Sequence, residues 1–165
     1  MKNYIISVLL LATFCISIVS CSKDEEGSAS SYTTEQIATL KVLHGTFVSE
    51  PDFIGATTEF TFYETYLDNP KIATGTNVYG EKREYTIHGY CTHKYNYGSV
   101  ADYDNKRAFY ISTNGVDMKL YHAFDDKTIS ANMAPDNYKI VVVNDNQIRL
   151  TDTNYPLNGS IYTRK

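Results

Sequence analysis

The sequence predicts an all-β domain built as one antiparallel, up-and-down barrel of about eight strands, after a single short N-terminal helix. Apolar and polar residues alternate with a period of two over most of residues 45–165, a pattern typical of strands. Short turns join these segments and favour antiparallel neighbours, because parallel strands need long crossovers. No second helix is predicted to cover a sheet face, so a closed sheet is favoured, and a β-sandwich is the alternative.

The helix is predicted over residues 34–43. Thr33 and Thr34 are suitable N-caps, and Gln36 follows Thr33 at the spacing of a capping box. Gly45 is a typical C-terminal stop. The apolar residues at helical spacing are Ile37, Leu40 and Leu43.

The strands are predicted from residues that alternate and therefore share a face. These sets are Phe60 and Phe62; Tyr85, Ile87, Cys91, His93, Tyr95 and Tyr97 in one long strand; Phe109 and Ile111; Val116, Met118, Leu120, His122 and Phe124; Tyr138, Ile140 and Val142; Ile148 and Leu150; and Ile161 in the last strand. Asn114-Gly115 is the strongest hairpin signal. A further turn is predicted at residues 144–146.

Residues 1–20 have the pattern of a signal peptide. Lys2 supplies a positive charge before an uncharged apolar stretch at residues 4–19, which is short for a spanning helix of about 20 residues. The residues just before Cys21 resemble the lipobox of bacterial lipoproteins: Ile18, Val19 and Ser20. The resemblance implies that Cys21 becomes the first mature residue, with an acylated amino terminus that anchors the protein in a membrane.

Residues 21–31 are predicted to be a polar tether, and residues 32–165 are the length of one domain. The charged residues of the tether resemble the export signal of Bacteroidota-type surface lipoproteins: Lys23, Asp24, Glu25 and Glu26. This resemblance implies display on the outer face of the outer membrane. The alternative is a solvated linker on a lipoprotein that faces the periplasm.

The composition limits the possible partners. The chain has a net charge of −4, and no basic run exceeds two residues, so nucleic acid is not an expected partner. Once Cys15 leaves with the signal peptide and Cys21 is lipidated, Cys91 is the remaining cysteine, and no intramolecular disulfide is expected. The 15 tyrosines suit strands and half-exposed surfaces.

The stretch after the predicted helix resembles the start of lipocalin-like domains of bacterial lipoproteins. A short helix is followed by Gly45, Thr46 and Phe47, where the family has Gly, any residue and Trp, so Phe47 departs from the pattern. The resemblance implies an up-and-down barrel. It also implies that Arg164, near the last strand, lies over the Phe47 ring in a cation–π contact.

Catalytic and metal sites find little support in the sequence, and no cofactor is expected. Cys91 and His93 share one predicted strand face, and His122 lies on a different strand. This arrangement falls short of the three or four convergent ligands that a zinc site needs. The sequence has no Gly-x-Ser-x-Gly elbow, and Cys91 is expected to be a small buried apolar residue rather than a nucleophile. A hydrolase that depends on His93 or His122 is the least favoured hypothesis.

The leading hypothesis is therefore a non-catalytic, membrane-anchored lipoprotein that binds a small apolar or glycan-derived ligand. The residues expected to line an internal pocket are Phe62, Tyr85, Tyr95, Leu120 and His122. The alternative is an interaction module that holds another envelope protein. Tyrosines in or beside the predicted loops suit either role: Tyr79, Tyr97, Tyr103 and Tyr155.

Overall fold

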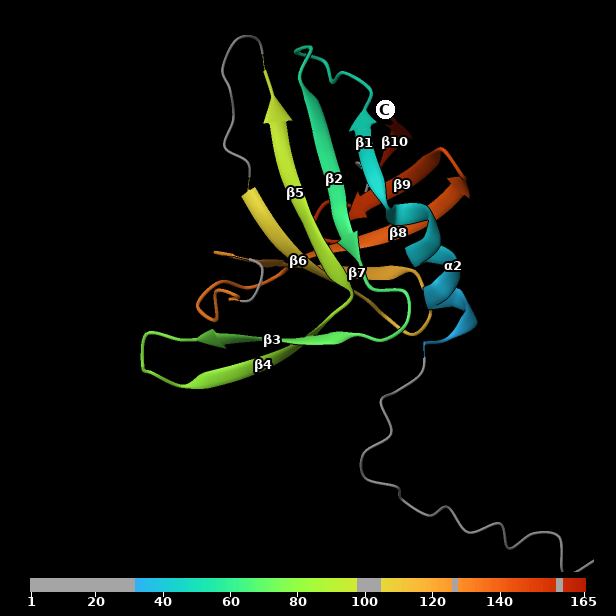
Figure 1. Ribbon diagram of the computed structural model, residues 1–165. Coiled ribbons are helices and arrows are strands. Elements are labelled where there is room, and N and C mark those ends of the chain that lie inside the picture. The colour runs from blue at the N-terminus through green and yellow to red at the C-terminus, as the bar shows by residue number, and fades with distance from the viewer. Residues whose placement is uncertain (1–31, 98–104, 126–127, 157–158) are drawn as a thin grey trace, which may run out of the picture.

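The computed structural model describes residues 32–97, 105–125, 128–156 and 159–165 (Figure 1). These residues form strands and one helix, α2 (Thr34–Leu43), which confirms the all-β prediction and the predicted helix limits. The strands are β1 (Gly45–Ser49), β2 (Thr57–Thr65), β3 (Lys71–Thr76), β4 (Lys82–Ile87), β5 (Gly89–Asn96), β6 (Asn105–Ile111), β7 (Asp117–His122), β8 (Asp136–Asn144), β9 (Gln147–Asp152) and β10 (Ser160–Arg164). No helix in the described ranges has the length and apolar character needed to cross a membrane.

Eight of these strands close into an antiparallel barrel, in the order β1-β10-β9-β8-β7-β6-β5-β2. The predicted eight-stranded barrel is confirmed, and the β-sandwich alternative is wrong. Strands that follow one another along the chain are neighbours in the barrel, except where the hairpin β3–β4 is inserted between β2 and β5. The Asn114-Gly115 turn joins β6 to β7, and residues 144–146 lie at the β8–β9 turn, as predicted.

The prediction of one long strand from Tyr85 to Tyr97 is wrong. The strand stops at Ile87, and a new strand starts at Gly89. β4 pairs with β3 outside the barrel, whereas β5 pairs with β2 and β6 inside it. The backbone at Gly89 packs so closely that an added Cβ would lie 2.0 Å from the carbonyl oxygen of Glu64. The chain therefore changes sheets at a point where only glycine fits.

Helix α2 closes one end of the barrel. Its predicted capping box is present: the Gln36 amide donates to Thr33 Oγ1 at 3.1 Å, and the Thr33 amide donates to Gln36 Oε1 at 3.0 Å. Leu40 and Leu43 are fully buried against the barrel core. Gln36 Nε2 also donates to the Ile111 carbonyl at 2.9 Å, so the helix is tied to the last residue of β6.

The last strand locks the helix to the barrel through Arg164. The guanidinium lies over the Phe47 ring, 4.6 Å from its centroid, as the lipocalin-like resemblance implies. It donates to the carbonyls of Val42, at 2.6 Å, and of His44, both at the C-terminal end of α2. A cation at this position satisfies carbonyls that the helix leaves unpaired.

The β3–β4 hairpin lies outside the barrel (Figure 1), and a second, smaller core is packed beneath it. The hairpin covers the outer faces of β5 and β6, where Tyr90 and Ala108 are buried. The Ile129 amide donates to the Thr74 carbonyl at 2.9 Å, so the β7–β8 connection holds the edge of β3. The other buried members of this core are Ala73, Ile87 and Ile129.

Candidate functional site at the open end of the barrel

The barrel interior changes character from the helix-covered end to the open end. Phe62 opposes Cys91, which opposes Arg107, which opposes His122, so these four side chains share the inner face. Phe62 is buried among aromatic rings, whereas Arg107 and His122 are charged or titratable. The apolar core therefore gives way to polar groups near the ends of β6 and β7 that face away from α2.

Three polar side chains at this end of the barrel form a cluster. Arg107 Nε lies 3.5 Å from Asp136 Oδ2, and His122 Nε2 lies 3.7 Å from the same oxygen. Asp136 is at the start of β8, where it opposes Leu120 across the β7–β8 ladder. One carboxylate thus faces both a guanidinium and an imidazole, and we refer to Arg107, His122 and Asp136 as the mouth cluster.

Arg107 is unusual because it is charged and its side chain is only 9% exposed. Its Nη1 donates to the Lys106 carbonyl at 3.2 Å. Its Nε is buried and has no hydrogen-bond partner, although it lies within ion-pair distance of Asp136. A buried cation with an unused donor is a binding group for an acidic ligand atom.

The surroundings hold the neighbouring titratable groups in their neutral forms. Burial, and to a smaller degree the Arg107 charge, lower the pKa of His122, against a smaller opposing effect of Asp136. Burial raises the pKa of Tyr138, which neighbours Asp136 and Asp152. At neutral pH the mouth cluster therefore holds one cation and one anion, and a ligand would meet neutral donors around them.

A hollow of about 440 Å³ opens beside the cluster. Its lining includes Arg107 and His122, the neighbouring cation Lys106, and two apolar residues of the β7–β8 connection, Phe124 and Met133. Phe124 is 73% exposed and Met133 is 51% exposed, so both present apolar surface to an entering molecule. The hollow thus combines a cation with apolar walls, which is the usual make-up of a small-molecule site.

The structure does not gather the five predicted lining residues into one pocket. Phe62 and Leu120 are fully buried in the core, and Tyr85 lies on β4, outside the barrel, with its ring 5.1 Å from that of Tyr121. Tyr95 is partly exposed, and its hydroxyl donates to Asp52 Oδ2 at 3.3 Å. Of the five, only His122 lines the hollow.

Sequence reasoning missed Arg107 and Asp136. Arg107 precedes Phe109 and Ile111 with the same alternation, so a signal was present: a charge at an inward position of a predicted strand. Nothing in the sequence marks Asp136 as its partner, since that contact depends on how β7 and β8 pair.

The other residues considered as catalytic or metal-binding groups, Cys91 and His93, are packed against the core of the barrel. Burial raises the pKa of Cys91 to about 12, which keeps its fully buried thiol protonated. His93 stacks on Phe60 with ring centroids 4.5 Å apart. In the part of the chain that the structure describes, no three His, Cys, Asp or Glu side chains are grouped to hold a metal ion.

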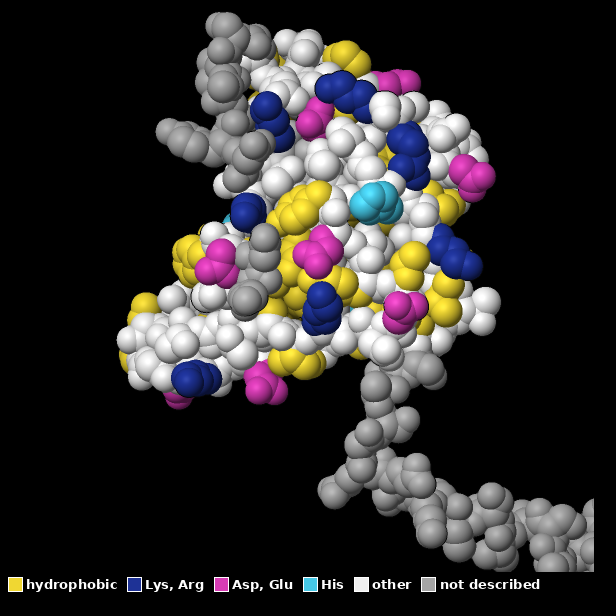
Figure 2. All heavy atoms as spheres, viewed as in Figure 1, with side chains coloured by type: hydrophobic (Ala, Val, Ile, Leu, Met, Phe, Trp, Pro, Cys, Tyr) yellow, Lys and Arg dark blue, Asp and Glu magenta, His cyan; other side chains and the backbone are white. Residues whose placement is uncertain are grey.

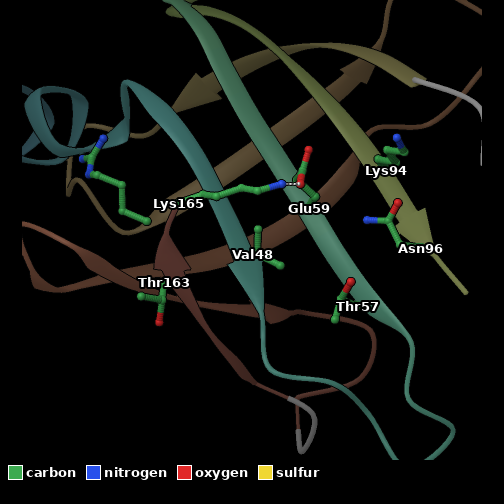
Figure 3. A pocket seen from close by; sticks show the side chains of 8 residues that line it. Val48, Thr57, Glu59, Lys94, Asn96, Thr163 and Lys165 are labelled. Atoms are coloured by element: carbon green, nitrogen blue, oxygen red, sulfur yellow. Dashed lines mark hydrogen bonds and ion pairs between the residues drawn. The ribbon is translucent and has the colours of Figure 1, made fainter.

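Of the further hollows formed by the described residues, two lie on the outside of the barrel. One, of about 540 Å³, lies across β1, β2, β5 and β10, and its charged groups Lys165 and Glu59 pair with each other at 3.3 Å (Figure 3). The other lies between β2 and the β3–β4 hairpin, where Lys71 Nζ sits 3.9 Å above the Tyr66 ring and 3.7 Å from Glu64. Neither offers a buried charge with an unused donor.

Comparison with protein-family models, with curated proteins and with solved structures finds no match for this chain. The barrel and its mouth cluster are therefore the basis for a functional assignment. The predicted lipidation and export residues lie outside the described ranges, as does Tyr103: Cys21, Lys23, Asp24, Glu25 and Glu26.

Proposed function

We propose that the protein is a lipoprotein of the outer membrane, anchored through Cys21 and displayed on the cell surface, that binds a small acidic ligand at the open end of its barrel without catalysis. The observation that supports the binding role most directly is Arg107, a mostly buried cation whose Nε has no hydrogen-bond partner, beside a hollow with apolar residues in its wall. Of the apolar and glycan-derived ligands that the sequence suggests, this arrangement favours an apolar body with a carboxylate or similar acid.

The filled barrel supports a site at the mouth rather than deep inside. The aromatic rings of Phe60, Phe62 and Phe109 pack on one another with centroids 5.3 to 6.1 Å apart in the inner core. Those contacts occupy the space in which an internal ligand would sit. A ligand at the mouth keeps this core intact and still reaches Arg107.

A ligand screen with matched pairs tests the binding role. Medium-chain carboxylates are compared with the corresponding alcohols by thermal shift and by titration calorimetry. We expect the carboxylates to raise the melting temperature and the alcohols to bind at least about tenfold more weakly, because only the acid pairs with Arg107.

Arg107→Met keeps an unbranched apolar stem and removes the guanidinium with its charge, and it should abolish the preference for the acid. The control is Arg149→Met, which changes an exposed arginine on the outer face of β9. Equal binding of acids and alcohols by the unaltered protein would reject the proposal.

The anchor is tested separately in cells. Cys21→Ser should move the protein from the membrane fraction to the soluble fraction and remove labelling by a clickable fatty acid. Replacing Lys23, Asp24, Glu25 and Glu26 together by alanine should keep the label but lower the accessibility of the domain to added protease. If these changes removed neither the lipid label nor the accessibility to protease, the proposed attachment and display would be wrong.

A further inference from the structure

The β3–β4 hairpin carries an unusual exposed apolar tip. In the turn between the two strands, Val78 is 75% exposed and Tyr79 is 86% exposed. Two further exposed apolar residues, Leu67 and Ile72, lie along the same segment toward its base. Scattered exposed apolar residues are ordinary, but three within one projecting hairpin and a fourth just before it form a surface that calls for an explanation.

The tip is held in a fixed conformation. Asn77 Oδ1 accepts from the amides of Tyr79 and Glu81, both at 2.9 Å. The Val78 amide donates to Asn132 Oδ1 at 2.9 Å, which ties the turn to the β7–β8 connection. Val78 and Tyr79 are therefore presented outward by a built turn, with little ordering left to occur when they meet a partner.

The chain enters the domain at the base of this hairpin. The hydroxyl of Tyr32, the first described residue, donates to the carbonyl of Tyr66 at 2.8 Å, in the segment that joins β2 to β3. The Tyr32 ring also meets His88, between β4 and β5, edge-on at 5.1 Å. The hairpin and the N-terminal entry of the chain thus share one side of the molecule.

Figures 1 and 2 show the same arrangement. The β3–β4 hairpin forms the lower edge of the domain, and the β1–β2 connection lies at the opposite end. Hydrophobic side chains lie around the hairpin in the space-filling view, with basic and acidic groups between them (Figure 2). The exposed basic residues are Lys71, Lys82 and Arg83, and Glu81 lies 3.8 Å from Arg83.

The length of the tether allows the hairpin to reach the membrane. Residues 21–31 span at most about 35–40 Å when fully extended, and the hairpin strands extend for roughly 20 Å from base to tip. A bilayer that holds the lipid on Cys21 therefore lies within reach of the tip. Tyrosine is a side chain that prefers the interface between bilayer and water.

We infer that Val78 and Tyr79 dip into the interface of the bilayer to which the protein is anchored and so fix the orientation of the domain. The inference rests on the proposed anchor at Cys21. The tether keeps the hairpin at high local concentration near the lipid, so a weak contact by a few side chains is sufficient.

The absence of tryptophan from the chain provides a direct test. Two single-tryptophan proteins are made, Tyr79→Trp at the hairpin tip and Phe53→Trp in the β1–β2 connection, where Phe53 is 97% exposed. The protein from Cys21 onward, which contains every described residue, is coupled through that thiol to a maleimide lipid. The vesicles contain phosphatidylcholine and phosphatidylglycerol, with or without bromine on the acyl chains. The buried Cys91 thiol does not compete for the maleimide.

We expect brominated lipid to quench the Tyr79→Trp emission at least about twofold, and we expect the Phe53→Trp emission to be unchanged. Val78→Ser added to Tyr79→Trp should weaken the quenching without changing the fold, since both positions are exposed. Equal emission of Tyr79→Trp in plain and brominated vesicles would overturn the inference, and so would equal quenching of both proteins. Because the coupling is chemical, this result is independent of whether cells lipidate Cys21.

Discussion

His88 is a buried histidine that the fold holds in its neutral form. Its ring is 1% exposed, and its Nδ1 accepts a hydrogen bond from the Ile111 amide at 2.9 Å. Two aromatic rings, those of Tyr32 and Tyr110, lie about 5 Å away. Burial lowers the pKa of His88 to about 4. The bond from His88 to the last residue of β6 therefore depends on an acceptor nitrogen that stays unprotonated.

This predicts a loss of stability in mild acid. An unfolded histidine takes up a proton near pH 6.5, whereas the folded His88 does so only near pH 4. The unfolded state therefore binds more protons between these values, and the free energy of unfolding falls as the pH is lowered through that window, by about 1–3 kcal/mol. Urea unfolding between pH 7 and 4 measures the effect.

The matched variant for this prediction is His88→Asn, because the amide oxygen can still accept from Ile111 but does not titrate. It is expected to be less stable than the unaltered protein at pH 7 and to lose less stability on acidification. Identical slopes of stability against pH in the two proteins would show that His88 does not contribute to acid sensitivity.

At the scale of the elements, α2 depends on its first residues. Thr33 Oγ1 accepts from the Gln36 amide and also donates to the Thr113 carbonyl at 2.7 Å, so it caps the helix and ties it to the β6–β7 turn. We predict that Thr33→Ala lowers the free energy of unfolding by about 1–2 kcal/mol, whereas Thr33→Ser, which retains the hydroxyl, loses at most a few tenths. Chemical denaturation compares the two, and equal losses would contradict the capping role.

The elements that the sequence predicts well are those fixed by local chemistry. The limits of α2 follow from Thr33, Gln36 and the spacing of the leucines, and the β6–β7 turn follows from Asn114-Gly115. The break between β4 and β5 could not be found in this way, because Ile87 and Cys91 keep the same alternation across it. It is set by the approach of Gly89 to Glu64, a contact between distant parts of the chain.

The candidate site was less predictable than the fold because it too depends on contacts between distant parts of the chain. His122 falls at an inward position that alternation identifies. Arg107 and Asp136 are brought to it by the pairing of β6, β7 and β8, and Phe124 and Met133 by the course of the β7–β8 connection. Tyr85 was expected at the site because alternation alone placed it in the barrel wall, whereas the β3–β4 pairing puts it outside.

At the scale of the whole molecule, the two ends of the barrel have different tasks. One end is closed by α2 and lies near the base of the β3–β4 hairpin, where the chain enters the fold. The other end exposes the mouth cluster and its hollow. Since the core between them is packed with aromatic rings, the barrel serves as a rigid support that holds the ligand-binding mouth at the end opposite α2.

This division predicts that Phe62 contributes to stability and not to ligand binding. Its ring is fully buried and packs edge-on against Phe47 and Phe109, with centroids 6.2 and 5.3 Å away. Phe62→Ala is expected to lower the free energy of unfolding by about 3–5 kcal/mol.

Phe62→Leu, a milder change that preserves the fold, should lose less stability and should bind a carboxylate ligand with an affinity within about twofold of the unaltered protein. Phe53→Ala, at an exposed position, should change stability by no more than about 0.5 kcal/mol. If Phe62→Leu kept full stability but lost the ligand, the ligand would have to lie inside the barrel, and the mouth cluster would not be its binding site.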